Sequence, residues 1–458
     1  MAKVQIKDNK PSLGDKKLDR FSNIESIEIK RLFGLYDYQL NLNKHVTSSS
    51  NLMVLYGDNG SGKTTILNLV YHLLSNEGDK GHRFFLLNVP FLSLKVILSC
   101  GAKITALRKN IDDTNLLGCY TILVEDGHNK KIEANFLANA DQADPNKLRL
   151  EPYLNWLKSK EITLRFISEN RHVRNYADSD IELGQERIFR IRQELEFPRL
   201  RTKKLENPID EVTLRTLESF NDWVKISTSQ GLNDGEANAN TIYNNIISRV
   251  AQQDKEHISD NSKEITEKVI RDITSIEITR QSYIKYGLFT NIDFSKILKI
   301  LKSENQKSKS IISEIIEPYV ESTLARFKAL SQVQNILSIF IDSLNSYFAD
   351  KSVRFTVNRG LVIESINGKQ LEPTMLSSGE KQLLLLLCDT VLSLKEKTII
   401  FLDEPEISLN IKWQRKLLKT LLKITEGMPI QIIVATHSLQ VLTEYSDSVV
   451  ALESKNLE

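Results

Sequence analysis

Cysteine is scarce in this chain of 458 residues, and the three that occur, Cys100, Cys119 and Cys388, lie far apart. Their spacing provides neither a disulfide framework nor a set of metal ligands, and an odd number of such cysteines is typical of a reducing compartment. Long apolar runs are also absent, since the strongest, Leu383 to Leu387, is far shorter than the ~20 residues that span a bilayer. The polar, lysine-rich stretch from Met1 to Lys17 lacks the apolar core of a signal peptide. We therefore expect a cytoplasmic protein without a membrane segment.

The chain also lacks a strong charge of either sign, because 61 Lys and Arg residues nearly balance 59 Asp and Glu residues. A net charge of +2 neither demands nor excludes a nucleic-acid surface, so any basic patch must be local. Two stretches are candidates for such a patch, Pro198 to Lys204 and Lys296 to Lys309, although solvated helix faces often have the same composition. The sequence therefore leaves a nucleic-acid partner open.

Hydrophobic patterning divides the chain into three segments. Short apolar runs typical of strands occur in residues 24–29, 36–42, 52–56 and 162–168, and again in residues 353–357 and 361–366. Between them, from about Pro198 to Phe348, helical spacing predominates, with interruptions expected at Gly231 to Gly235 and near Gly287. We predict an α/β fold whose two halves, residues 1–195 and 350–458, flank a mainly helical insertion at residues 196–349 that acts as a lever.

A phosphate-binding loop is the first motif that carries chemistry. The stretch from Gly57 to Thr64 fits the pattern G-x-x-x-x-G-K-[ST], and it follows a strand-like run and precedes a helical one. Lys63 is expected to reach the β- and γ-phosphate oxygens, and the Thr64 hydroxyl to bind Mg²⁺. The predicted nucleotide contacts of this segment are Gly57, Asp58, Asn59, Gly60, Ser61, Gly62, Lys63, Thr64 and Thr65.

Two further motifs follow apolar runs in the last part of the chain. The run from Thr398 to Glu404 ends in two carboxylates, of which Asp403 is expected to hold Mg²⁺ and Glu404 to orient or deprotonate the attacking water. His437 follows a second run and is placed to contact the γ-phosphate. Each motif alone also fits a buried strand with solvated polar residues at its end. Their order after the phosphate loop favours the catalytic interpretation.

The sequence LSSGE at residues 376–380 completes the set. Leu376 comes 313 residues after Lys63 and 27 residues before Asp403. In this order the motifs resemble those of ABC-type ATPases, specifically the branch of the SMC proteins, RecF-like proteins and OLD-family defence ATPases. The resemblance covers the two α/β halves. Residues 57–64 match Walker A, residues 376–382 the signature, residues 398–404 Walker B, Ser408 to Asn410 the D-loop, and His437 the switch histidine.

This resemblance implies a P-loop ATPase head with a mixed sheet and an antiparallel β subdomain, interrupted by the helical insertion. It implies ATP and Mg²⁺ as cofactors, with Lys63, Glu404 and His437 in catalysis and Thr64 and Asp403 at the metal. It also implies a homo-oligomer, as a dimer or a multimer of dimers, because ATP bound by Lys63 of one copy is shared with the signature of another. The signature residues are Leu376, Ser377, Ser378, Gly379 and Glu380.

Within this branch, OLD nucleases continue into a TOPRIM nuclease domain, and because 21 residues follow His437 here, we expect this chain to lack one. A compact ATPase of this kind resembles the ATPase subunit of bacterial anti-phage systems, PARIS-like in the first place and Septu-like in the second. That likeness implies a sensor of a phage-encoded trigger protein, which controls a separately encoded nuclease or toxin, for example one of TOPRIM type. The alternative is a RecF- or SMC-like ATPase that binds DNA during repair.

Overall fold

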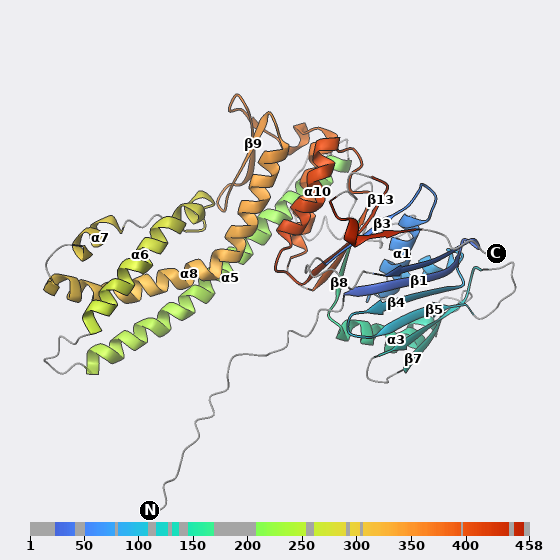
Figure 1. Cartoon of the computed structure of the whole chain (residues 1–458), viewed down its shortest axis with the longest axis horizontal. Helices are drawn as coiled ribbons and strands as arrows, with labels where there is room; N and C mark the ends of the chain where they lie inside the picture. Colours follow the sequence, from blue (N-terminus) through green and yellow to red (C-terminus); the bar gives the residue numbers. More distant parts are fainter. Residues whose placement is uncertain are drawn as a thin grey trace, which may run out of the picture. The chain divides into compact units, whose positions relative to one another are not determined.

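The computed structural model describes residues 23–41, 51–77, 81–108, 116–126, 131–136, 145–168, 208–252, 261–289, 294–302, 306–394, 397–438 and 444–452. The chain forms two compact units (Figure 1). The first comprises residues 1–200, 393–407 and 427–458, and the second comprises residues 201–392 and 408–426. Both units are therefore assembled from segments that lie far apart in the sequence.

A five-stranded parallel sheet lies at the centre of the first unit, in the order β14-β3-β13-β12-β8. Every residue of β12 and β13 is buried, which explains why these strands read as unbroken apolar runs. Helix α1, Lys63–Leu74, follows β3 after the loop at residues 57–62. The strands are β3 (Leu52–Tyr56), β8 (Thr163–Ile167), β12 (Thr398–Asp403), β13 (Ile430–Thr436) and β14 (Val449–Ala451).

The second sheet of this unit has six antiparallel strands, in the order β2-β1-β4-β5-β6-β7. Its buried face shares one hydrophobic core with α1, α3 and the parallel sheet. Gln431 of β13 joins the two sheets, since its side chain accepts a hydrogen bond from the Ile24 amide and donates one to the Ile24 carbonyl, each 2.8 Å long. The elements are β1 (Ile24–Leu32), β2 (Tyr36–Asn41), α2 (His82–Leu87), β4 (Ser93–Leu98), β5 (Lys103–Leu107), β6 (Tyr120–Glu125), β7 (Lys131–Phe136) and α3 (Pro145–Ser159).

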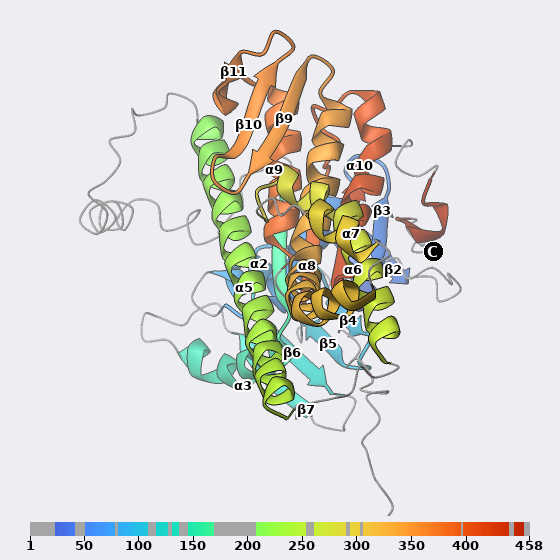
Figure 2. The same ribbon diagram turned by 90° about the vertical axis from the view of Figure 1, so that its left-hand side faces the viewer.

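Long helices and a small antiparallel sheet make up the second unit. Helices α5 (Pro208–Gln252) and α8 (Gln306–Tyr347) run side by side (Figures 1 and 2). The rings of Phe220 and Phe340 stack between them with centroids 4.5 Å apart. Strands β9, β10 and β11 form one sheet, visible together in Figure 2. The remaining elements are α6 (Asn261–Lys285), α7 (Ser295–Leu301), β9 (Lys351–Thr356), β10 (Gly360–Ser365), β11 (Gln370–Leu371), α9 (Ser378–Leu392) and α10 (Ile411–Ile424).

The small sheet and the helices α9 and α10 belong to the same compact unit as the long helices, although patterning grouped them with the C-terminal half. Two asparagines join the sheet to the long helices. Asn345 of α8 exchanges two hydrogen bonds with the backbone of Val353, 2.7 and 2.9 Å long, and Asn221 of α5 accepts one from the Leu361 amide. These side chains form hydrogen bonds with backbone amide and carbonyl groups of the sheet, which need such partners when they are buried.

The interruption expected at Gly231 to Gly235 is wrong, because these residues lie inside α5. A Cβ on Gly231 would lie 2.9 Å from Cδ2 of Leu330 and 3.2 Å from the carbonyl oxygen of Ala329. The glycine therefore allows close approach of α5 to α8 instead of breaking the helix. The interruption near Gly287 is confirmed, since α6 ends at Lys285 and Gly287 adopts a left-handed φ of 69°.

Of the two candidate basic stretches, Pro198 to Lys204 lies outside the described residues. Part of the other stretch forms the short helix α7, on which Lys296 and Lys299 are exposed. Within the parts of the chain that the structure describes, no helix combines the length and apolar character required to cross a bilayer.

Candidate nucleotide-binding site

The phosphate loop connects the end of β3 to the start of α1. Gly60 and Gly62 adopt left-handed φ angles of 85° and 89°, which glycine reaches without strain. A Cβ on Gly62 would lie 3.0 Å from Cδ2 of Leu32 and 3.3 Å from Cε2 of Phe33, so space also favours glycine there. The Lys63 ammonium donates to the carbonyls of Gly57 and Asp58, at 2.8 and 3.0 Å. A loop of this shape in front of a helix N-terminus is suited to bind phosphate.

Thr64 and Asp403 meet at the end of the parallel sheet. The Thr64 hydroxyl donates a hydrogen bond of 2.9 Å to Oδ1 of Asp403, although the two residues are 339 positions apart. Hydroxyl and carboxylate oxygens are the hard ligands that Mg²⁺ prefers, and in such sites the phosphates complete the coordination. Among the described residues there is no group of three or more His, Cys, Asp or Glu side chains that could hold a metal. The Thr64 and Asp403 oxygens would therefore fit a Mg²⁺ that also binds the phosphates of a nucleotide.

Glu404 and His437 lie at the ends of the neighbouring strands β12 and β13. The Nδ1 atom of His437 is 3.2 Å from Oε1 of Glu404, and the Glu404 amide donates to the Ala435 carbonyl at 2.9 Å. Glu404 has a left-handed φ of 46°, a conformation that costs a non-glycine residue energy and that clusters at functional sites. The structure thus brings Lys63, Thr64, Asp403, Glu404 and His437 together at the carboxyl ends of three adjacent strands.

Glu406 is a residue of this site that the sequence motifs did not indicate. It is buried, and it accepts a hydrogen bond from the Thr436 hydroxyl, which in turn accepts one of 3.0 Å from the Ser438 amide. Burial raises the pKa of the Glu406 carboxyl, and the bond from Thr436 opposes this shift only in part. These contacts fix the backbone on both sides of His437. No motif marks such a position, because the partner lies on another strand.

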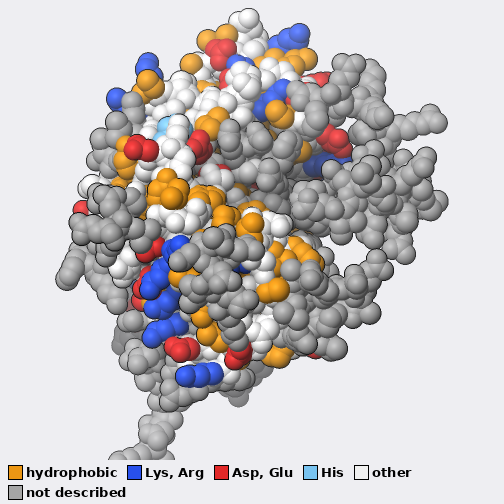
Figure 3. Space-filling model, turned by 90° about the vertical axis from the view of Figure 1, so that its right-hand side faces the viewer, with side chains coloured by type: hydrophobic (Ala, Val, Ile, Leu, Met, Phe, Trp, Pro, Cys, Tyr) orange, Lys and Arg blue, Asp and Glu red, His pale blue; other side chains and the backbone are white. Residues whose placement is uncertain are grey.

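Strand β2 and the loop that precedes it border the phosphate loop. The Tyr38 hydroxyl donates to the Ser61 carbonyl at 2.9 Å, and Phe33, with a left-handed φ of 56°, remains 39% exposed. An exposed aromatic ring beside bound phosphates can stack on a nucleotide base. Hydrophobic side chains are also exposed between charged ones on the face of the molecule drawn in Figure 3.

The signature residues lie in the second unit, at the start of α9. Ser377 and Ser378 are exposed, whereas Leu376 and Glu380 are buried. A Cβ on Gly379 would lie 2.7 Å from the carbonyl oxygen of Ser408, so the signature backbone lies directly against the predicted D-loop. Asn410 ends this loop by capping α10, since its Oδ1 accepts a hydrogen bond of 3.0 Å from the Trp413 amide.

A parallel sheet with a phosphate loop after β3 and paired carboxylates at the end of β12, the next strand but one, defines a P-loop ATPase, and the predicted α/β class is confirmed. The sequence profile described as AAA ATPase domain matches residues 23–442, and the chain belongs to this family.

Other similarities are weaker. A protein of Clostridium acetobutylicum named "Putative ABC transporter ATP-binding protein" is 30% identical over 115 residues, which cover 25% of this chain and 40% of that protein. The chain thus spans less than half of that relative. An Smc head domain from Pyrococcus furiosus, bound to the C-terminal domain of ScpA, is 15% identical, with a TM-score of 0.35 over 94% of this chain and 93% of that one. An Smc head from Pyrococcus yayanosii is 14% identical, with a TM-score of 0.35 over 94% of both chains.

Proposed function

We propose that this chain is an ATPase that works as a switch, in which two copies associate around shared ATP. The observation that carries the proposal is the cluster at the strand ends, where Thr64 is bonded to Asp403 and Glu404 lies beside His437. In this proposal Lys63 binds the β- and γ-phosphates, and Thr64 and Asp403 hold the Mg²⁺ that neutralises their charge. Glu404 orients and deprotonates the attacking water, and His437 contacts the γ-phosphate.

The exposed serines of the signature support the shared site. Ser377 and Ser378 lie at the N-terminus of α9, where the helix dipole favours an anion. In this proposal they contact the nucleotide carried by a second copy, as the resemblance to ABC-type ATPases implies.

We expect ATP, and not ADP, to cause association of the purified chain, measured by sedimentation velocity. Ser378→Arg should abolish this association, because a long cationic side chain would occupy the position of the phosphate. Lys369→Arg, at an exposed lysine between β10 and β11, is the control and should behave as wild type. A dimer that forms without nucleotide and that tolerates Ser378→Arg would contradict the shared site.

We further propose that the switch serves anti-phage defence, with the long helices α5 to α8 sensing a phage trigger and controlling a separately encoded nuclease or toxin. The motif set and the helical unit support this proposal through their likeness to PARIS-like ATPase subunits. Function must be specified outside the nucleotide site, since that site is common to many activities.

Cells that express this chain together with its neighbouring reading frame should form fewer plaques on phage challenge than cells with an empty vector. Lys63→Ala should restore plaque formation, because loss of the phosphate contacts disables the switch. Lys369→Ala should protect like wild type. Equal plaque counts for wild type and Lys63→Ala would contradict the defence role and leave the ATPase assignment untouched.

One observation favours the second candidate, a DNA-binding ATPase. Helix α10 presents the exposed lysines Lys412, Lys416, Lys419 and Lys423 at intervals of three and four residues, and it contains no acidic residue. Among the described residues, none of the four forms an ion pair. Lys412 lies in the first turn, where a positive charge opposes the helix dipole. Lysines about 5–6 Å apart along one helix face can pair with the negative phosphates of a DNA backbone. Such contacts do not depend on the base sequence.

A further inference from the structure

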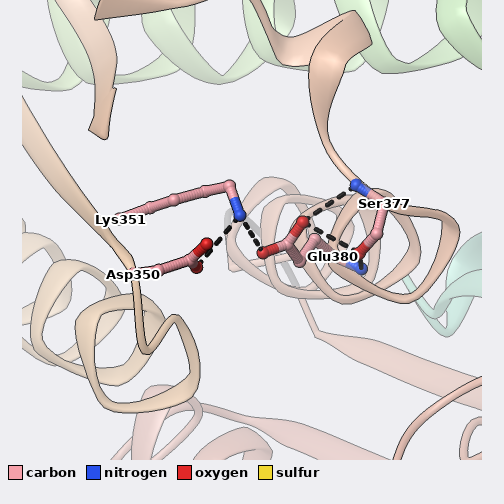
Figure 4. Close-up of polar contacts among 4 residues, drawn as sticks. All are labelled: Asp350, Lys351, Ser377 and Glu380. Atoms are coloured by element: carbon pink, nitrogen blue, oxygen red, sulfur yellow. Dashed lines mark hydrogen bonds and ion pairs between the residues drawn. The ribbon is translucent and has the colours of Figure 1, made fainter. Parts of the chain in front are cut away.

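A small polar network surrounds the start of the signature helix (Figure 4). Oε2 of Glu380 accepts hydrogen bonds from both the amide and the hydroxyl of Ser377, each 2.8 Å long. Its other oxygen, Oε1, accepts a hydrogen bond of 2.9 Å from the Lys351 ammonium, which also lies 3.0 Å from Oδ1 of Asp350. The Lys351 and Glu380 side chains are only 16% and 8% exposed. This ion pair is therefore largely withdrawn from water.

The Glu380 amide in turn donates to the Ser377 hydroxyl at 3.4 Å, so the two residues form a capping box, which stabilises the first turn of α9 by itself. A capping box does not require a lysine, yet Lys351 reaches it from the first residue of β9, just after α8. The next residue of the signature helix is held in a similar way, since the Lys381 ammonium donates a hydrogen bond of 2.6 Å to Asp210 in the first turn of α5. Helix α5 and strand β9 are thus each connected to the signature helix by an ion pair that is largely withdrawn from water.

Electrostatics keep the Lys351–Glu380 pair charged at neutral pH. Burial would raise the pKa of Glu380, but the hydrogen bonds from Lys351 and Ser377 outweigh burial, and the net shift is downward. The bond to Glu380 raises the pKa of Lys351. A buried carboxylate without its partner would hold its remaining hydrogen-bond donors more strongly, because no other charge compensates it.

We propose that Lys351 is a positioning residue that sets how readily the Ser377 hydroxyl leaves Glu380 to donate to the terminal phosphate of ATP on a second copy. The inference rests on the proposed shared site. Oε2 of Glu380 accepts the same hydroxyl proton that the phosphate would receive, so the two contacts compete. Lys351 weakens the hold of the carboxylate on Ser377 and screens the phosphate from it. Because Lys351 begins β9, which follows the end of α8 at Tyr347 after residues 348–350, the long helices can influence nucleotide sharing through this contact.

The test adds Lys351→Gln or Lys351→Met to the Glu404→Gln variant, in which ATP remains bound. The reference protein is Glu404→Gln with Lys351 unchanged. Loss of one charge-assisted contact predicts ATP-dependent association about 10- to 100-fold weaker, measured by sedimentation velocity. The affinity of a single copy for a fluorescent ATP analogue, measured at low protein concentration, should stay within about twofold, since Lys63 and Asp403 are untouched. Lys351→Arg should restore association, and the exposed Lys369→Gln serves as the matched control.

The double variant Lys351→Gln/Glu380→Gln tests whether Lys351 acts by compensating the negative charge of Glu380. With no carboxylate left to compensate, removing Lys351 should weaken association far less than it does beside Glu380. Lys351→Gln retains a hydrogen-bond donor, so it decides the question if Lys351→Met fails to fold. If the chain with Lys351 associates on ATP and Lys351→Gln associates equally well, the inference is overturned but the proposed function is not. A wild-type chain that does not associate on ATP would overturn the proposed function, and the inference with it.

Discussion

Replacing Glu404 by Gln should leave ATP binding intact and lower the hydrolysis rate by about two to three orders of magnitude. The amide keeps the size of the side chain but loses the basicity required to accept a proton from water, and general-base catalysis contributes roughly 10²- to 10⁴-fold. The ATP-bound dimer should accumulate as a result. Phosphate release gives the rate, titration with a fluorescent nucleotide gives the affinity, and sedimentation velocity gives the dimer.

Two comparisons make this result specific to Glu404. Lys63→Ala should lose both binding and hydrolysis, because the Lys63 ammonium supplies the contacts to the β- and γ-phosphates. Glu372→Gln changes an exposed glutamate elsewhere and should leave both properties unchanged. Hydrolysis at the wild-type rate by Glu404→Gln would assign the base to another residue. Glu406 is the less suitable alternative, since it is buried and bonded to Thr436.

Exchange of Lys412, Lys416, Lys419 and Lys423 for Gln should weaken binding to duplex DNA by about a thousandfold at ~0.1 M salt. Each phosphate contact adds about 0.9 to the slope of log K against log salt concentration, so four lost contacts should lower this slope by about 3.6. The measurement is fluorescence anisotropy with a labelled duplex at several salt concentrations. Binding should not depend on the DNA sequence, since lysines on one helix face contact only the backbone.

The control for this experiment removes the same charge elsewhere. Lys103, Lys131, Lys225 and Lys328 are exposed and lie outside α10, so their exchange for Gln should change the affinity and the slope only slightly. Equal effects of the two fourfold variants would mean that net charge, and not α10, attracts DNA. Wild-type chain that binds no DNA with or without ATP would exclude the second candidate and favour the defence role.

The sequence by itself determined the nucleotide-binding half of this protein. Strands β3, β12 and β13 begin and end within two residues of the apolar runs that predicted them. Buried parallel strands must be apolar on both faces, so their pattern does not depend on distant partners. The loop from Gly57 to Thr64 is readable for a similar reason, because its glycines and its lysine act through local backbone geometry. Membership of the AAA ATPase domain family agrees with this part of the prediction.

Only the tertiary structure decided the role of residues whose type fits more than one local structure, because their partners come from distant segments. Gly231 lies in a glycine-containing stretch typical of a turn, yet it belongs to α5. A glycine is required there because α8 approaches too closely for a side chain. The contacts of Glu406 with Thr436 and of Glu380 with Lys351 join residues 30 and 29 positions apart. Pairs of this kind leave no periodic pattern, since each partner alone fits an ordinary polar position. The role of such a pair depends on whether it is buried and on which strands and helices lie next to each other. Both are set by the folded structure and not by the local sequence.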